Sequence, residues 1–160
     1  LKHMNNKRTL IIIVFLLIFI NVCFIWWNSF QVSEVSNSVS DTVADVVKPI
    51  IDPIVEPITS DDGKIFGYKY NAFIRKMAHV FEFMVLGALL VILRNIRHIH
   101  ISTILFIALA IAVTDETIQI FNGRSDSVKD IVIDFVASLA GMIVTSIIFL
   151  IVRYMKKRKK

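Results

Sequence analysis

The chain has 160 residues, of which 56% are hydrophobic and 19% are charged. This balance is unusual for a water-soluble domain, and the apolar residues gather in long blocks that predict membrane spans. The net charge is +5, but the basic residues stand at the ends of these blocks, where they set membrane topology. Nucleic acid is therefore not an expected partner. The single cysteine, Cys23, excludes an internal disulfide and a cysteine-based zinc site.

The first predicted span covers residues 9–27. It follows two basic residues and ends in Trp26 and Trp27, which resemble an interfacial aromatic pair. No small-residue cleavage site follows the apolar block, so we expect a retained anchor and not a signal peptide. Residues 1–8 are expected to be a short cytoplasmic N-terminus that opens with a cloning remnant ahead of a native start at Met4.

Residues 28–71 form the only long polar segment and are expected to be extracytoplasmic. A short repeat with proline at every fourth residue, from Pro49 to Pro57, predicts turns or extended chain. Before it, valines at steps of three and four predict an amphipathic helix on the membrane surface. These valines are Val32, Val35, Val39, Val43 and Val46.

Residues 72–152 are expected to form the core of the protein. They contain three further spans, at about 72–93, 101–121 and 128–152, each near or above the ~20 residues needed to cross a bilayer. Residues 153–160 form a basic tail. The predicted fold class is all-α, an integral membrane bundle of four transmembrane helices with the amphipathic surface helix after the first span.

Basic residues predict the orientation of this bundle. Those before the first span, those between the second and third spans, and those of the tail fall on one side if there are four spans. Positive charge marks the cytoplasmic side. Both termini are therefore expected in the cytoplasm, and the segments 28–71 and 122–127 are expected to face outward.

Polar residues also lie within the spans, where a charge at the helix centre costs at least about 2.5–3.5 kcal/mol. They recur at steps of three and four, so each span carries one polar stripe, and the stripes lie at the same outer level. We expect them to face one another or a water-filled cavity, with Asn21, Asn28 and Ser29 of the first span nearby. The three stripes are Arg75, His79 and Glu82, with Lys76 beside them; Asp115, Gln119 and Asn122, with Glu116 one turn below Gln119; and Asp126, Asp130, Asp134 and Ser138.

The carboxylates of these stripes outnumber the basic residues beside them. Burying unpaired carboxylates is costly, so at least one should be protonated, hydrated or bound to a cation. One histidine with several carboxylates is a reasonable ligand set for a divalent metal. From the residues alone, three interpretations stay open: a structural network, a ligand or lipid pocket, and a metal-dependent enzyme.

The ordered motifs on these spans resemble those of VanZ-like membrane proteins. Lys76, His79, Glu82 and Phe83 have the spacing of the family signature K-x-x-H-x-x-E-[FY]. The run from Thr114 to Phe121, followed by Gly123 and Arg124, resembles the second motif, and Asp130-x-x-x-Asp134 ending in Gly141 resembles the third. The family has Asp or Asn at Asp134. The resemblance covers essentially the whole chain.

The family takes its name from a protein that raises resistance to the lipoglycopeptide teicoplanin. The resemblance therefore implies a protein of a bacterial cytoplasmic membrane that acts in the cell envelope and in antibiotic resistance. It supplies a phenotype and not a reaction, so it does not decide whether the protein is an enzyme.

The first hypothesis is a non-catalytic module that binds a membrane lipid, a lipid-linked cell-wall precursor or the lipoglycopeptide in an outward-facing cavity. Basic residues would hold its phosphate or carboxylate groups. The predicted ligand-binding residues are Arg75, Lys76, Asp115, Gln119, Arg124 and Asp134.

The second hypothesis is a metal-dependent intramembrane hydrolase or transferase that acts on an envelope lipid. A divalent metal would activate water, and a carboxylate would serve as general base. The predicted metal ligands and catalytic residues are His79, Glu82, Glu116 and Asp130. A structural network is the third hypothesis, and a proton-coupled transporter, which would require a homodimer, is the fourth.

Overall fold

The computed structural model describes residues 2–31, 53, 70–122 and 128–158. These residues form four long helices and no strand, and each helix is long and apolar enough to cross a membrane. This confirms the predicted all-α bundle. The predicted surface helix at 32–46 and the proline repeat lie outside the described residues. The helices are α1 (Lys2–Phe30), α3 (Tyr70–Arg97), α4 (Ile101–Phe121) and α5 (Val128–Arg158).

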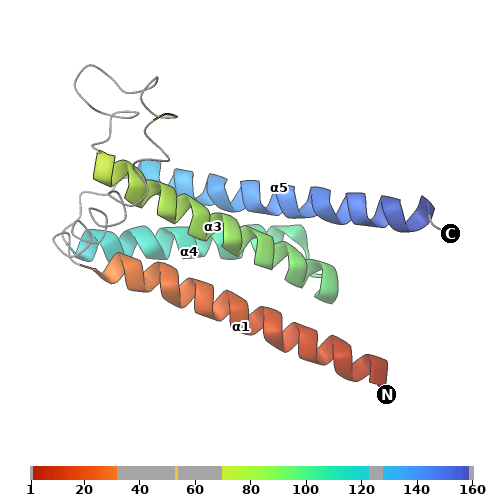
Figure 1. Ribbon diagram of the computed structural model, residues 1–160. Coiled ribbons are helices and arrows are strands. Elements are labelled where there is room, and N and C mark those ends of the chain that lie inside the picture. The colour runs from red at the N-terminus through yellow and green to blue at the C-terminus, as the bar shows by residue number, and fades with distance from the viewer. Residues whose placement is uncertain (1, 32–52, 54–69, 123–127, 159–160) are drawn as a thin grey trace.

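The four helices lie side by side, with both ends of the chain at one end of the bundle (Figure 1). Helix α3 makes its largest contact with α5 and also packs on α1, while α4 contacts α1 and α5. Helix α5 continues to Arg158, so most of the basic tail extends the last helix beyond the predicted end of its span at residue 152. Lysine and arginine favour helix, and their positive charge suits a helix C-terminus.

Helices α3 and α4 are joined by only three residues, 98–100, which makes them antiparallel neighbours. The chain reverses at His98, which has a φ of 56° in the left-handed region where helices commonly end. Arg94 and Arg97 lie in the last turn of α3, where their charge is favourable to the helix dipole.

The buried face of each helix changes from apolar to polar along its length. On α4, Ile104, Ala108 and Ala112 are fully buried at steps of four, and the same face then continues into Asp115 and Gln119. A comparable change occurs on α3 and on α5. Because α3 and α5 run opposite to α4, all the polar halves meet at the end of the bundle that lies away from the chain termini.

Two glycines allow α3 and α5 to come into backbone contact. A Cβ atom at Gly87 would lie 2.0 Å from the carbonyl oxygen of Ser138, and one at Gly141 would lie 2.0 Å from that of Met84. In a membrane, where lipid is as apolar as the helix surface, close approach between small residues is a main source of helix association. The glycines therefore allow the two helices that carry Glu82 and Asp134 to pack in direct backbone contact.

We expect Gly87→Ala to separate α3 from α5 and to lower the free energy of unfolding by about 1–3 kcal/mol, the usual cost of overpacking. Unfolding in mixed detergent micelles, followed by circular dichroism, measures this change. Val144→Ile is the matched control, because it adds one methyl group to an exposed position of α5. Equal stability of the Gly87→Ala variant and the control would contradict the close approach.

Candidate functional site

Nine polar side chains are buried together at the end of the bundle away from the termini. Each is at most 9% exposed, although most of the surface around them is apolar. All four helices contribute, so the cluster exists only in the assembled bundle. We call this group the polar cluster: Ser29 of α1; His79 and Glu82 of α3; Asp115, Glu116 and Gln119 of α4; and Asp130, Asp134 and Ser138 of α5.

Helix α1 enters the polar cluster through two hydrogen bonds to carboxylates. Asn28 Nδ2 donates to Glu82 Oε1 at 2.7 Å, and Ser29 Oγ donates to Asp115 Oδ1 at 2.5 Å. Hydrogen bonds to charged acceptors are stronger than neutral ones. Because α1 is apolar from Leu10 to Trp27 apart from Asn21, these bonds help to fix which face of α1 meets the bundle.

His79 lies between two acidic residues from different helices. Its Nδ1 atom is 3.6 Å from Glu82 Oε2, one turn along α3, and 4.0 Å from Asp115 Oδ2 on α4. Gln119 Nε2 donates to the same Asp115 oxygen at 2.6 Å and approaches Glu116 Oε1 at 3.5 Å. A histidine beside carboxylates in this way can accept, hold or pass on a proton.

Lys76 and Asp130 form an ion pair that joins α3 to α5. Their side chains are 17% and 13% exposed, so the pair lies at the rim of the polar cluster while the other acids lie deeper. Lys76 can therefore reach a group that arrives from outside the bundle.

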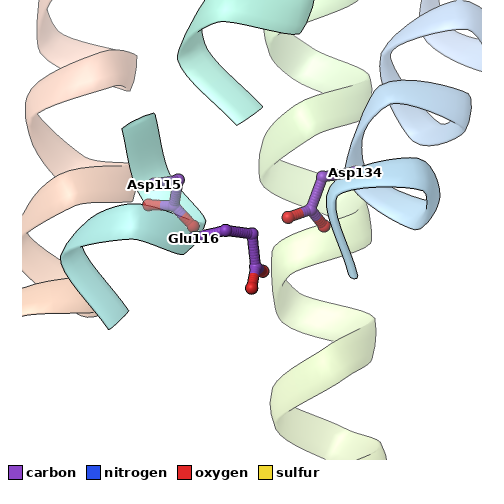
Figure 2. A group of neighbouring side chains, drawn as sticks. All are labelled: Asp115, Glu116 and Asp134. Atoms are coloured by element: carbon purple, nitrogen blue, oxygen red, sulfur yellow. The ribbon is translucent and has the colours of Figure 1, made fainter. Parts of the chain in front are cut away.

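Three carboxylates converge in the interior of the polar cluster (Figure 2). Asp115 and Glu116 on α4 and Asp134 on α5 each place one oxygen within 4.8 Å of the others. Neither oxygen of Asp134, which is 1% exposed, accepts a hydrogen bond from a described amide, hydroxyl or amine. Such acids are stable together only if they share protons or a cation.

The residues present fit a hard divalent cation. Mg²⁺ and Ca²⁺ prefer oxygen ligands, and Mg²⁺ is often held by a few carboxylates together with water or a substrate phosphate. Among the described residues, the group that can share one ion is Asp115, Glu116 and Asp134. Glu116 alone is common to this group and to the metal set predicted from the sequence.

The other three predicted metal ligands lie in the polar cluster, around this group. His79 and Glu82 adjoin Asp115 from the side of α3, while Asp130 pairs with Lys76 one turn farther out. Of the predicted ligand-binding residues, Lys76, Asp115, Gln119 and Asp134 belong to the site. Arg75 lies on the first turns of α3 and is half-buried, and Arg124 lies outside the described residues.

The sequence placed Asn28 and Ser29 only near the site, whereas both bind its acids directly. A signal for this existed, because Asn21 and Asn28 are seven residues apart and so share a face of α1. Asn21 Nδ2 also reaches the backbone carbonyl of Glu82, at 3.5 Å. Polar residues on one face of an apolar span thus indicated its packing side.

A comparison with protein families gives one match. The family model described as VanZ/LLP1 matches residues 10–150, which include α3, α4 and most of α1 and α5. No curated protein and no solved structure gives a significant match. The matched region contains every residue of the polar cluster.

Proposed function

Since this chain belongs to the VanZ/LLP1 family, we propose that it acts in the cell envelope of a bacterium and contributes to teicoplanin resistance. Its polar cluster would bind the polar group of a membrane lipid, of a lipid-linked cell-wall precursor or of the lipoglycopeptide itself. The observation that carries this proposal is the burial of nine polar side chains, five of them carboxylic acids, inside one end of an apolar bundle.

A purely structural network would satisfy each of its buried members, because an unsatisfied polar group lowers stability. The polar cluster departs from this rule at Ser138 Oγ, which has no hydrogen-bond partner among the described residues, and at Asp134, which accepts no hydrogen bond from a described amide, hydroxyl or amine and lies beside two other acids. Groups that are costly for the fold and that gather in one place are typical of a site kept for a ligand.

The charge distribution supports an outward-facing site. Arg94 and Arg97 end α3, and Lys156 to Arg158 end α5, at the end of the bundle where the chain begins. Positive charge favours the cytoplasmic side, which supports a position of the polar cluster in the outer half of the membrane.

Lys76 is suited to hold the incoming group. Its ammonium group can exchange Asp130 for a phosphate or carboxylate, since both are anionic oxygen acceptors. Deeper in the cluster, His79 and Glu82 would orient the bound group, or would accept a proton from it or donate one to it. Asn28, which donates to Glu82, would keep that carboxylate directed toward the histidine.

We expect His79→Ala, Glu82→Gln and Glu116→Gln to abolish the teicoplanin protection that the chain gives a susceptible host, down to the level of an empty vector. The measurement is the minimal inhibitory concentration, with the amount of each variant in the membrane checked by immunoblot. His100→Ala is the matched control, because His100 is exposed at the other end of the bundle, and it should protect like the wild type.

Full protection by abundant variants would overturn the proposal and leave the polar cluster a structural network. If the wild type gives no protection while being abundant in the membrane, the resistance role itself is wrong.

A metal-dependent hydrolase or transferase acting on an envelope lipid is the second candidate, favoured by the three converging carboxylates. A divalent ion held by Asp115, Glu116 and Asp134 would supply an activated water or polarise a phosphoryl oxygen. His79, which faces Asp115 across 4.0 Å, would accept the proton released in that step.

For this candidate we expect the protein, purified with manganese and desalted, to retain a stoichiometric amount of the ion by elemental analysis. Asp134→Leu should lose at least about nine-tenths of it, because the change removes one of the few charged ligands that fix such an ion. Thr117→Ala, an exposed change on α4, is the control and should keep the metal. Equal metal content in all three proteins, or none in the wild type, would exclude the candidate.

A further inference from the structure

An apolar groove lies in the half of the bundle opposite to the polar cluster. Helices α3, α4 and α5 line it, and its volume is about 280 Å³. Two of its residues on α5, Ile147 and Leu150, are 50% and 63% exposed, so the groove opens toward the lipid side of the bundle. This volume is just below the roughly 300–1,000 Å³ of small-molecule pockets.

The groove follows from how the helices pack. Helix α3 is held tightly to α5 by Gly87 and Gly141, but it contacts α4 much less. Toward the cytoplasmic end, α4 begins only at Ile101, while α5 continues past it to Arg158. The three helices thus leave a space between them in the inner half of the membrane.

A cationic side chain stands at one end of this groove. Arg94 lines this end of the groove together with Ile101 and Leu150. The remaining lining residues are apolar apart from Ser146. The Nε atom of Arg94 is buried and has no hydrogen-bond acceptor among the described residues. An acceptor for this guanidinium is therefore expected from outside the described chain.

No described acidic residue can supply that acceptor. All five Asp and Glu residues of the described helices belong to the polar cluster at the opposite end. Near Arg94, the side chain of Asn95 donates to the carbonyl oxygen of Val91 at 2.9 Å and accepts from Arg153 at 3.4 Å, and neither bond involves the Arg94 guanidinium. The cytoplasmic end of the bundle thus offers positive charge without a matching negative charge.

We propose that this groove is a binding site for an anionic phospholipid of the cytoplasmic leaflet, with one acyl chain in the groove and the phosphate on Arg94. An arginine guanidinium binds phosphate oxygens through two parallel hydrogen bonds. The groove would hold the acyl chain against the protein and away from the surrounding lipid. The proposal is independent of the function of the polar cluster, which lies at the other membrane surface.

The test is native mass spectrometry of the purified full chain in detergent with equal amounts of phosphatidylglycerol and phosphatidylcholine. We expect the wild type to prefer phosphatidylglycerol at least about fivefold, the preference that one basic residue near a membrane surface supplies. Arg94→Gln should remove this preference, and Arg94→Lys should keep most of it. The matched control is Arg97→Gln, which loses the same charge from an exposed position on the same helix that does not line the groove.

A second variant tests the acyl-chain part. Ser146→Trp fills the groove from α5 without changing its charge, and it should weaken phosphatidylglycerol binding about as much as Arg94→Gln does. Excess inorganic phosphate should not displace the lipid, because it has no acyl chain. An equal loss in Arg97→Gln and Arg94→Gln would show diffuse charge attraction and overturn the proposal. So would displacement by phosphate alone, or unchanged lipid binding in a folded Ser146→Trp variant.

Discussion

The burial of carboxylates inside a membrane-spanning bundle is the constraint on which the rest of this structure depends. Each acid would be far more costly against lipid than against another polar group. Helices that carry acids on one face can therefore turn that face only toward one another. This requirement sets the rotation of α3, α4 and α5 together, and the bonds from Asn28 and Ser29 set the rotation of α1.

The buried face of each helix differs between its two halves, one of which packs the bundle while the other carries the polar cluster. In the half near the chain termini these faces are apolar, and small residues let α3 and α5 touch at Gly87 and Gly141. This contact fixes the spacing between the two helices, whose other halves carry the polar side chains of the cluster. Where α4 does not follow α3 closely, the bundle leaves the apolar groove that ends at Arg94. A site that is unfavourable for folding is thus supported by packing elsewhere in the same helices.

Much of this architecture could be predicted from the sequence, because residues three or four positions apart lie on the same side of a helix. Steps of three and four placed His79 and Glu82 on one side of α3, and Asp130, Asp134 and Ser138 on one side of α5, and all five are buried together. The length of the apolar blocks predicted four spans, and the structure has four such helices.

The grouping of the acids could not be predicted in the same way. Asp115 and Glu116 are adjacent, so they point about 100° apart on α4, and a single stripe accounts for only one of them. Both are buried because α4 meets α1 and α3 on one side, where Ser29 and His79 approach Asp115, and α5 on the other, where Asp134 lies near Glu116. That depends on which helices are neighbours, and spacing within one helix carries no such information.

The measurement that tests the central claim most directly is the free energy of unfolding of Asp134→Leu, compared with the wild type in the absence of divalent cations. If the polar cluster is kept for a ligand, removing a buried carboxylate that lies beside two other acids and accepts no hydrogen bond from a described amide, hydroxyl or amine should leave the protein at least as stable as before. A loss of more than about 1–3 kcal/mol, the cost of breaking a needed buried hydrogen bond, would show that Asp134 holds the bundle together and would contradict the account.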